Sequence, residues 1–393
     1  MTAIVLYFHV HQPYRLRRYT FFDIGVDGRW FDDAENERIM KRVAERCYLP
    51  MNALLTHLVE KSDGAFRCAL SITGTALDQM ERWAPKALES FRALAATGSV
   101  ELVSETSHHS LASMTDAEEF RAQVVNHTKR LETTLGRRPR TFRNTELVFD
   151  DEVARVAEDL GFEAMLGEGA DHVLGARSAH GVYRPQGCTK IRLLLRDYRF
   201  SDDIAFRFTN RSWSEWPLTP AKFAGWLADT PPESEQIGLF MDYETAGEHQ
   251  WAETGIFAFM ESLPEAVARE SRLRFATPSE AAKAATTVVP IHVPRPVSWA
   301  DAERDLSAWL GNEMQRAAHD ALYALLPAVR EDGRKSMLER WRKLSASDHV
   351  YYMCTKFASD GDVHSYFSPY ATPHDAFIAF MNVIDDFARR LRK

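Results

Sequence analysis

Two carboxylates stand closely behind apolar segments whose composition is typical of buried strands. Glu146 follows the segment Thr141–Arg143, and Asp242 follows Ile237–Met241. In parallel β/α folds the reactive side chains gather where the strands end. Cleavage of a glycosidic bond needs such a pair, because one carboxylate attacks or stabilises the anomeric carbon and the other protonates the leaving oxygen. Arg143, three residues before Glu146, could keep that carboxylate ionised through its positive charge.

Histidines follow the same kind of segment. His9 and His11 come at the end of the first apolar run, and alternation along a strand puts both rings on one face. A zinc site completed by His108, His109 or Asp242 is compatible with this spacing. The chain has no CxxC pair and no HExxH helix, so we interpret the histidines as hydrogen-bonding partners of sugar hydroxyls or of the carboxylates, with no metal.

Composition and charge exclude several classes of protein. The 393 residues include 48 basic and 56 acidic side chains, a net charge of −8 that does not suit a nucleic-acid partner. The apolar start of the chain is too short for a signal peptide, and no apolar run is long enough to span a membrane. We therefore expect a cytoplasmic protein. The dispersed cysteines match neither a zinc site nor a disulfide scaffold: Cys47, Cys68, Cys188 and Cys354.

Aromatic residues are the one compositional hint of a ligand. Tryptophan, tyrosine and phenylalanine make up 11% of the chain, and much of this must be core. Some of them nevertheless lie in polar segments, where an aromatic face suits the apolar face of a sugar. These segments are Trp213–Trp216, Tyr351–Tyr352 and Tyr366–Phe367.

The segments that could position these residues are short apolar runs, and longer segments with helical spacing separate them. This alternation along the chain is typical of a buried parallel sheet. The alternation favours a TIM-like barrel, complete or incomplete, or a large doubly wound sheet. Gly161 is expected to end the helix at Asp150–Asp159 with a positive φ. The other predicted helices are Glu35–Lys61, Thr115–Leu135 and Gly255–Glu270. The predicted strands are Ala3–Phe8, Ala65–Ile72, Val100–Val103, Thr141–Arg143, Ala164–Leu166, Ile191–Leu195, Ile237–Met241 and Leu273–Ala276.

A change in composition predicts the domain organisation. Residues 288–298 contain three prolines within ten positions and are interpreted as a semi-rigid linker between a catalytic domain at 1–287 and a helical domain at 299–393. Helical spacing dominates after this linker. The helices expected there are Asp301–Tyr323, Ala328–Leu344 and Asp375–Leu391.

The order of the polar segments resembles that of glycoside hydrolase family 57, an α-amylase-like family with a (β/α)7 barrel and a helical appendage. FRNTEL followed by DYETAGEHQW carries most of the likeness, whereas HQP alone is weak. The resemblance implies an α/β fold in which an incomplete TIM-like (β/α)7 barrel precedes a C-terminal α-helical domain that completes the substrate cleft. It extends over His9–Tyr14, Gly98–Leu111, Thr141–Val153, Gly238–Trp251 and Ser347–Tyr370.

The resemblance also implies roles for individual residues. Glu146 is expected to be the nucleophile of a retaining mechanism and Asp242 its general acid/base, acting without metal or cofactor on α-1,4 linkages of starch, glycogen or maltooligosaccharides. Gln12, Arg143 and Trp216 join the substrate-binding candidates through their positions beside these motifs and in a polar aromatic loop. The remaining candidates are His11, Glu105, His109, Glu244, His249, Trp251, Asp348 and His349.

Several features remain open at this stage, among them the preference for α-1,4 or α-1,6 linkages, endo or exo action, and chain length. The motifs do not distinguish hydrolysis from transfer by a 4-α-glucanotransferase or a branching enzyme, and the oligomeric state is undetermined. More distant alternatives are a metal-dependent carbohydrate deacetylase and a non-catalytic glucan-binding or regulatory protein. Ala246 stands where the family usually has an aromatic residue, which puts the shape of one subsite in doubt. We expect Glu146 and Glu244 to raise the pKa of Asp242.

Overall fold

Seven parallel strands close into a barrel in the computed structural model, which describes residues 1–356 and 368–391. Neighbouring strands pair in the order β1, β2, β3, β4, β5, β7 and β8. β8 then pairs with β1 from Ala3↔Gln236 to His9↔Asp242, which closes the ring. The strands are β1 (Thr2–Val10), β2 (Cys68–Ile72), β3 (Val100–Ser104), β4 (Thr141–Arg143), β5 (Ala164–Glu168), β7 (Arg192–Arg196) and β8 (Gln236–Asp242).

The alternation of side chains along β1 decides which residues reach the barrel mouth. Ala3, Val5 and Tyr7 pack inside the barrel. Ile4, Leu6 and Phe8 pack outward against the helices. Both faces are buried, which explains why the segment reads as a continuous apolar run. His9 continues the inward row and is thereby brought to the mouth of the barrel.

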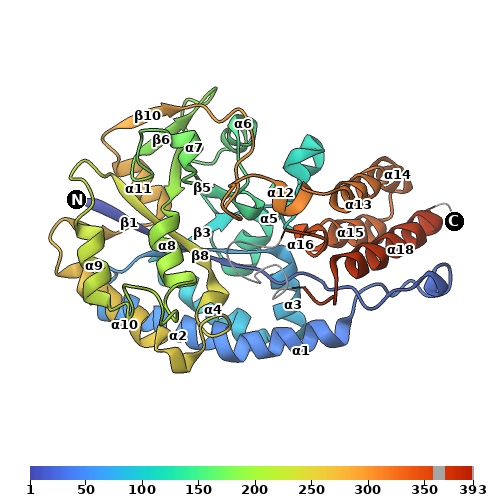
Figure 1. The fold of residues 1–393 in the computed structure, drawn as a ribbon, viewed down its shortest axis with the longest axis horizontal. Helices are drawn as coiled ribbons and strands as arrows, with labels where there is room; N and C mark the ends of the chain where they lie inside the picture. Colours follow the sequence, from blue (N-terminus) through green and yellow to red (C-terminus); the bar gives the residue numbers. More distant parts are fainter. Residues whose placement is uncertain (357–367, 392–393) are drawn as a thin grey trace.

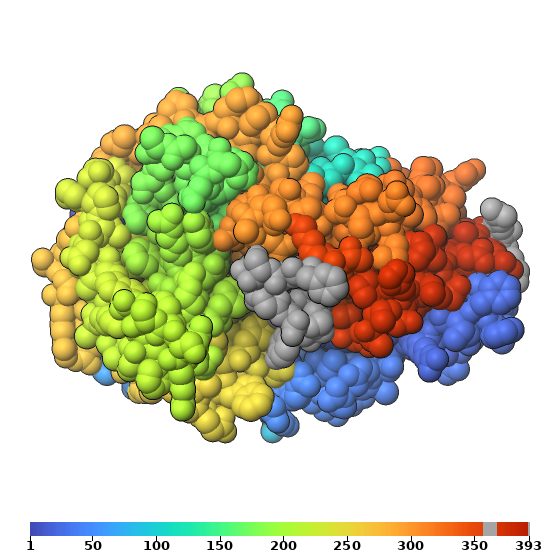
Figure 2. Space-filling view, viewed as in Figure 1, coloured from blue at the N-terminus to red at the C-terminus, as the bar shows by residue number. Residues whose placement is uncertain are grey.

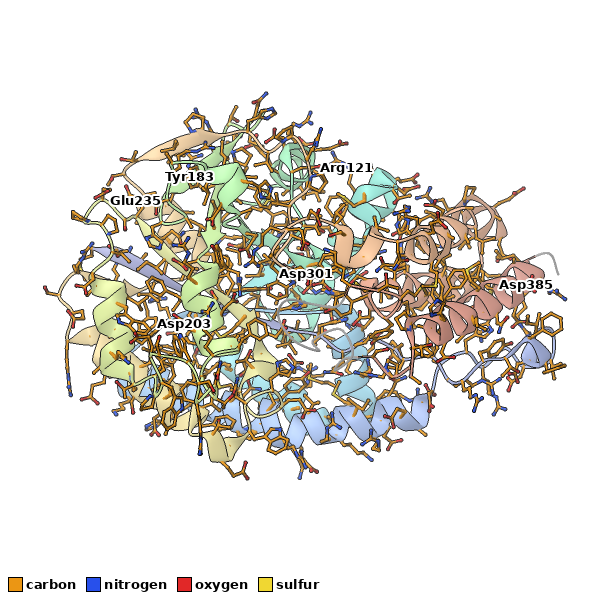
Figure 3. All side chains as sticks on the ribbon, in the orientation of Figure 1. Arg121, Tyr183, Asp203, Glu235, Asp301 and Asp385 are labelled. Atoms are coloured by element: carbon orange, nitrogen blue, oxygen red, sulfur yellow. The ribbon has the colours of Figure 1, made fainter. Side chains whose placement is uncertain are left out.

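Three further strands lie outside the ring. β6 (Val182–Pro185) runs antiparallel to β7, and β9 (Leu273–Phe275) pairs with the first residues of β1. The predicted linker begins with β10 (Val288–Ile291), which pairs in parallel with β6, so this part of it is a strand at the sheet edge. Tyr183, labelled in Figure 3, marks β6. The predicted domain boundaries themselves stay a prediction.

Helices surround the barrel and bury its outer face, as Figure 1 shows. The predicted helix at Glu35–Lys61 is interrupted by a π-helical turn at Ala44–Tyr48. Gly161 has a φ of 88° after α6, which confirms the expected helix end. These helices are α1 (Asp33–Val43), α2 (Leu49–Lys61), α3 (Gly74–Trp83), α4 (Pro85–Ala96), α5 (Ala117–Leu135), α6 (Asp151–Asp159), α7 (Asp171–Leu174), α8 (Tyr198–Ala205), α9 (Pro220–Ala228), α10 (Ile256–Ala268) and α11 (Pro278–Ala284).

The C-terminal region is helical and lies against one side of the barrel. Its apolar side chains, such as Trp341 and Phe380, belong to the same buried cluster as Phe120 of α5 and Phe142 of β4. Shared burial of this kind fixes the helices relative to the barrel. The helices are α12 (Ser307–Leu310), α13 (Glu313–Tyr323), α14 (Leu326–Asp332), α15 (Lys335–Leu344), α16 (Ser347–Tyr351) and α18 (Pro373–Leu391).

The N-terminal segment that follows β1 also contacts the C-terminal helices. In Figure 2 it lies in blue beside the red α18. Trp30 Nε1 donates to Asp386 Oδ2 at 2.8 Å, and the Gly25 amide donates to the other oxygen of that carboxylate at 2.7 Å. The segment that follows β1 is thus joined to α18. The predicted fold class, a (β/α)7 barrel followed by a helical region, is confirmed. Among the described residues, no helix has the length and apolar character needed to cross a membrane.

Candidate active site

Glu146 occupies a tight turn directly after β4. Its φ is 57° and that of Leu147 is 52°, a left-handed conformation that non-glycine residues rarely adopt. Leu147 is buried inside the barrel, and the amide of Trp299 donates to the Glu146 carbonyl at 3.3 Å. The surrounding contacts thus hold a conformation that is strained in isolation, a situation common at functional sites.

Three side chains from distant segments donate hydrogen bonds to the Glu146 carboxylate. His109 Nε2 and Ser347 Oγ lie 2.9 Å and 3.0 Å from Oε1, and Trp299 Nε1 lies 2.8 Å from Oε2. Ser347 and Trp299 belong to the C-terminal region, so the helical part of the chain completes the surroundings of Glu146. Only 16% of the Glu146 side chain is exposed.

His109 is held between two carboxylates. Its Nδ1 lies 3.2 Å from Glu105 Oε2, and its Nε2 contacts Glu146. Both ring nitrogens must carry a proton to donate to both partners. Burial alone lowers the pKa of His109, but the charges of Glu146 and Glu105 and their hydrogen bonds raise it to about 9. His109 is therefore an imidazolium at neutral pH.

Buried side chains connect Glu146 to Asp242. Glu105 Oε2 also lies 3.3 Å from His9 Nε2, and His9 Nδ1 lies 3.4 Å from Asp242 Oδ1. Burial raises the pKa of Glu105, but His9, His109 and Arg143 outweigh it and hold that pKa well below its usual range. The sequence of contacts is Glu146, His109, Glu105, His9 and Asp242; we call it the histidine–carboxylate chain.

Arg143 acts on Glu146 from a distance rather than as a direct partner. Its Nη1 lies 3.4 Å from both Glu105 Oε2 and His9 Nε2, at the middle of the histidine–carboxylate chain. Burial raises the pKa of Glu146, whereas the charge and hydrogen bond of His109, with the charge of Arg143, bring it below its ordinary value. The expected ionisation of Glu146 is therefore confirmed, with His109 as its main cause.

The expected rise in the pKa of Asp242 is wrong. Desolvation raises this pKa, but the hydrogen bond and charge of His9, together with His249 and Arg143, bring it below its ordinary value. The pKa of Glu244 is raised instead. Burial and the nearby charge of Asp242 bring it to about 7. The sequence could not show that His9, 233 positions away, is the partner of Asp242.

Glu244 is positioned by the π-helical turn that interrupts the first long helix. Tyr48, the last residue of the turn, donates to Glu244 Oε1 at 2.6 Å, and Gln12 Nε2 lies 3.4 Å from the same oxygen. Gly247 approaches the turn so closely that a Cβ there would lie 2.1 Å from the Arg46 carbonyl oxygen. Such turns often occur at functional sites. No sequence pattern marked Tyr48.

His11 and Asp348 bring the barrel and the C-terminal helices together. His11 Nε2 lies 2.9 Å from Asp348 Oδ2, and its Nδ1 lies 3.0 Å from Thr73 Oγ1. Burial and the charge of His109 lower the pKa of His11 to about 4, so this ring is neutral and donates through Nε2. Its ring stacks on that of His109 with centroids 4.0 Å apart.

The remaining predicted residues have surroundings of different kinds. His349 Nε2 contacts the Lys343 carbonyl at 3.2 Å and its ring packs against Phe380, within the helical region. Trp216 and Trp251 are 42% and 62% exposed. His249 lies near enough to Asp242 for their charges to interact. The predicted aromatic segment Tyr366–Phe367 lies outside the described residues, as do residues 357–367 of the motif at 347–370.

Ala246 belongs to the packing of the barrel exterior. It is 3% exposed and lies within the apolar cluster between strands and helices. A larger ring at this position would therefore face the core rather than an open cleft. Alanine in place of the usual aromatic residue therefore changes the volume of the core at this position and does not reshape a sugar subsite.

Among the residues that the structure describes, two groups of side chains have ligand atoms within 4.8 Å of one another, close enough for a metal ion. In the first, Arg143 Nη1 already lies 3.4 Å from His9 Nε2 and from Glu105 Oε2, so a positive charge stands beside the atoms that would bind the ion. In the second, His109 would have to give up a hydrogen bond to Glu105 or Glu146. The groups are His9, Glu105 and His109, and His11, His109 and Asp348.

Comparisons with known proteins identify the family. The family model described as "Glycosyl hydrolase family 57" matches residues 5–294. A protein of Methanocaldococcus jannaschii named "Putative alpha-amylase" is 39% identical over 98% of this chain and 84% of its own length. Two solved structures share the fold. The 4-alpha-glucanotransferase of Thermococcus litoralis has a TM-score of 0.68 and 16% identity, covering 89% of this chain and 56% of that one.

The second structure is a family 57 branching enzyme from Pyrococcus horikoshii. It has a TM-score of 0.66 and 17% identity, covering 90% of this chain and 86% of that one. At such identities the two structures support the fold alone, whereas the family match and the 39% identical relative also bear on the chemistry. The chain belongs to glycosyl hydrolase family 57 and is a glycoside hydrolase.

Proposed function

We propose that this protein is a retaining glycoside hydrolase that cleaves α-1,4 linkages in α-glucans, with Glu146 as nucleophile and Asp242 as general acid/base. The observation that carries the proposal is the histidine–carboxylate chain, which ends in one carboxylate at each side of the barrel mouth. The two carboxylates have different surroundings, as their different roles require.

In the first step Glu146 attacks the anomeric carbon while the bond to the leaving sugar breaks. The leaving oxygen takes the proton of Asp242, so the products are a glycosyl-enzyme ester and a free sugar end. The low pKa of Glu146 keeps it ionised for the attack. Asp242, with 39% of its side chain exposed, gains its proton as bound glucan excludes water and disfavours the charged form.

In the second step Asp242 removes a proton from a water molecule. The water oxygen bonds to the anomeric carbon as the ester bond to Glu146 breaks, and Glu146 leaves as a carboxylate. His109 remains an imidazolium throughout and stabilises the returning negative charge. The two inversions give a product with the configuration of the substrate.

A sugar hydroxyl could replace water in the second step, which would make the enzyme a 4-α-glucanotransferase or a branching enzyme. The relatives named above include both, so the test must separate the outcomes. We expect maltoheptaose to give shorter oligosaccharides only, by chromatography and mass spectrometry, and the Glu146→Gln variant to give none. Oligomers longer than heptaose would contradict hydrolysis, and a new α-1,6 linkage by NMR would identify branching.

The same assay tests the two distant alternatives. A metal-dependent deacetylase would lose activity on an acetylated sugar after treatment with a chelator, whereas we expect glucan cleavage to be unchanged by it. A non-catalytic glucan-binding protein would retain its function in the variants Glu146→Gln and Asp242→Asn. Glucan cleavage that depends on both carboxylates but on no metal excludes both alternatives.

A further inference from the structure

Another buried carboxylate, Glu168, lies at the mouth end of β5 and takes no part in the steps above. It is 1% exposed. Arg196, at the end of β7, has Nη1 3.4 Å from Glu168 Oε2, and Arg304, from the C-terminal region, has Nε 3.9 Å from Oε1. A buried carboxylate is costly unless it is paired, so its retention between two arginines raises the question of what the arginines hold.

Arg304 holds the loop that carries Trp299. Its Nη1 donates to the Trp299 carbonyl at 2.6 Å, and its own carbonyl accepts from the Ser298 amide at 3.2 Å. Arg304 has a φ of 52°, so the loop closes through a conformation that non-glycine residues rarely adopt. Contacts with fixed neighbours are needed to maintain it. Asp301, labelled near the centre of Figure 3, lies in this loop.

Arg196 contacts the same tryptophan from the barrel side. Its guanidinium lies 5.8 Å from the centre of the Trp299 ring, and the guanidinium of Arg143 lies 5.0 Å from the same centre. Cations at these distances attract the face of an indole. Arg196 Nε also donates to the Phe240 carbonyl at 2.8 Å, two residues before Asp242. The contacts of Glu168 therefore converge on Trp299 through both arginines.

Trp299 in turn donates to Glu146 Oε2 at 2.8 Å. A hydrogen bond to the charged form of a carboxylate lowers its pKa, and it also fixes the orientation of the oxygen that must face the anomeric carbon. A purely structural ion pair would stabilise the fold without changing this hydrogen bond. The two possibilities differ in what happens to the chemistry of Glu146.

We propose that Glu168 is a positioning residue for the nucleophile: through Arg304 and Arg196 it holds Trp299 so that the indole N–H stays on Glu146. This inference rests on the proposed function of Glu146. Without the Glu168 charge, Arg304 keeps Asp202 Oδ2 at 4.0 Å but loses its contact with the end of β5. The loop then loosens, and the indole hydrogen bond is made for less of the time.

The test uses the full chain with Glu168→Gln, Trp299→Phe and the double variant. We expect Glu168→Gln to lower kcat/KM about 10-fold, the effect of one weakened hydrogen bond to a charged group. The acidic limb of its pH profile should move to higher pH, because Glu146 becomes easier to protonate. The double variant should be no slower than Trp299→Phe alone, since both changes remove the same hydrogen bond.

Asp386→Asn is a matched control, because Asp386 is also fully buried, is paired with an arginine, and accepts an indole N–H from Trp30. It should lower the melting temperature and leave kcat/KM and the pH profile unchanged. If Glu168→Gln does not fold, Arg304→Lys replaces it. The lysine keeps the charge but lacks the guanidinium that reaches both Trp299 and Glu168, so the same slowing and the same non-additivity are expected.

Two outcomes would overturn the proposal. One is a folded Glu168→Gln or Arg304→Lys variant with an unchanged pH profile and kcat/KM. The other is a double variant whose losses multiply. The variant Glu146→Gln distinguishes these outcomes from failure of the proposed function. If Glu146→Gln is active, Glu146 is not the nucleophile. If Glu146→Gln is inactive but Glu168→Gln has the kcat/KM and pH profile of the natural protein, only the positioning role of Glu168 is contradicted.

Discussion

The two carboxylates proposed to carry the reaction are held in very different ways. Glu146 is 16% exposed and receives hydrogen bonds from His109, Ser347 and Trp299 on a strained backbone turn. The Asp242 side chain is 39% exposed and has His9, at 3.4 Å, as its hydrogen-bonding partner among the contacts described above. The first environment is rigid, the second open to water.

The difference corresponds to two kinds of work. A nucleophile acts best when its orientation and its charge are fixed before the substrate arrives. A general acid/base must exchange a proton twice in each cycle, so its pKa must respond to what is bound. The C-terminal region contributes directly to the fixed side, because Ser347 and Trp299 both come from beyond the barrel.

Replacing either carboxylate should have the largest effect on activity, and the product formed with azide should show which one is the nucleophile and which the general acid/base. Glu146→Ala and Asp242→Ala should each lower glucan cleavage at least about 10²–10⁴-fold. On 4-nitrophenyl α-maltoside, whose leaving group needs no proton, Asp242→Ala with azide should give the α-glycosyl azide. Glu146→Ala with azide should give the β-azide, because azide then attacks in place of the carboxylate. NMR of the products is the measurement, and exchanged configurations would reverse the roles.

A substitution with a smaller expected effect on activity tests the surroundings of Glu146 alone. Ser347→Ala removes one hydrogen bond from Glu146 Oε1 and should lower kcat/KM about 10-fold, the usual effect of losing a hydrogen bond to a charged group. Ser345→Ala is the matched control, because Ser345 Oγ donates to the Arg342 carbonyl instead. Initial rates on maltoheptaose provide the comparison, and equal rates for the two variants would show that Ser347 does not act on Glu146.

The exposure of Asp242 should make its pKa respond to bound substrate, and pH profiles can detect this response. The pKa of Asp242 is below its ordinary value, mainly because His9 opposes the effect of desolvation. Bound glucan excludes water and raises it, so the alkaline limb of kcat should lie at higher pH than that of kcat/KM. A separation of about one pH unit or more is expected. Coincident limbs would mean that substrate does not change the protonation of Asp242.

The smallest effect concerns stability. Burial and Asp242 raise the pKa of Glu244 to about 7 in the folded protein, from 4.5. A raised carboxyl pKa contributes stability that is complete below about pH 4.5 and is lost as the pH rises through 7. Glu244→Gln does not titrate, so its melting temperature relative to the natural protein should be about 2–4 °C higher at pH 8 than at pH 5. A constant difference would show that Glu244 is ionised at both pH values.

The sequence predicted the strand ends well and the partners poorly. Apolar runs behind Glu146 and Asp242 were enough to expect a parallel barrel, because burial on both faces of a strand leaves a recognisable pattern. Trp299, Ser347 and Tyr48 carry no such pattern. Their contacts with the carboxylates depend on how the C-terminal helices pack and on a π-helical turn, which are tertiary features.

Glu168 illustrates the same limit. It is the last residue of β5, whereas the predicted strand Ala164–Leu166 ends two residues before it. Its place between Arg196 and Arg304 arises from residues 28 and 136 positions away, which no local pattern could connect. The pKa of Asp242 was misjudged for a related reason, since its hydrogen-bonding partner His9 comes from β1.

The most direct test of the account is to trap the glycosyl-enzyme. The protein would be incubated with a 5-fluoro-α-glycosyl fluoride, which forms the ester quickly and releases it slowly, and then digested with trypsin. We predict one added glycosyl group by intact mass, located by fragmentation on Glu146 within the peptide spanning residues 144–155. A label on any other residue, or turnover with inverted configuration and no adduct, would contradict the proposed retaining mechanism.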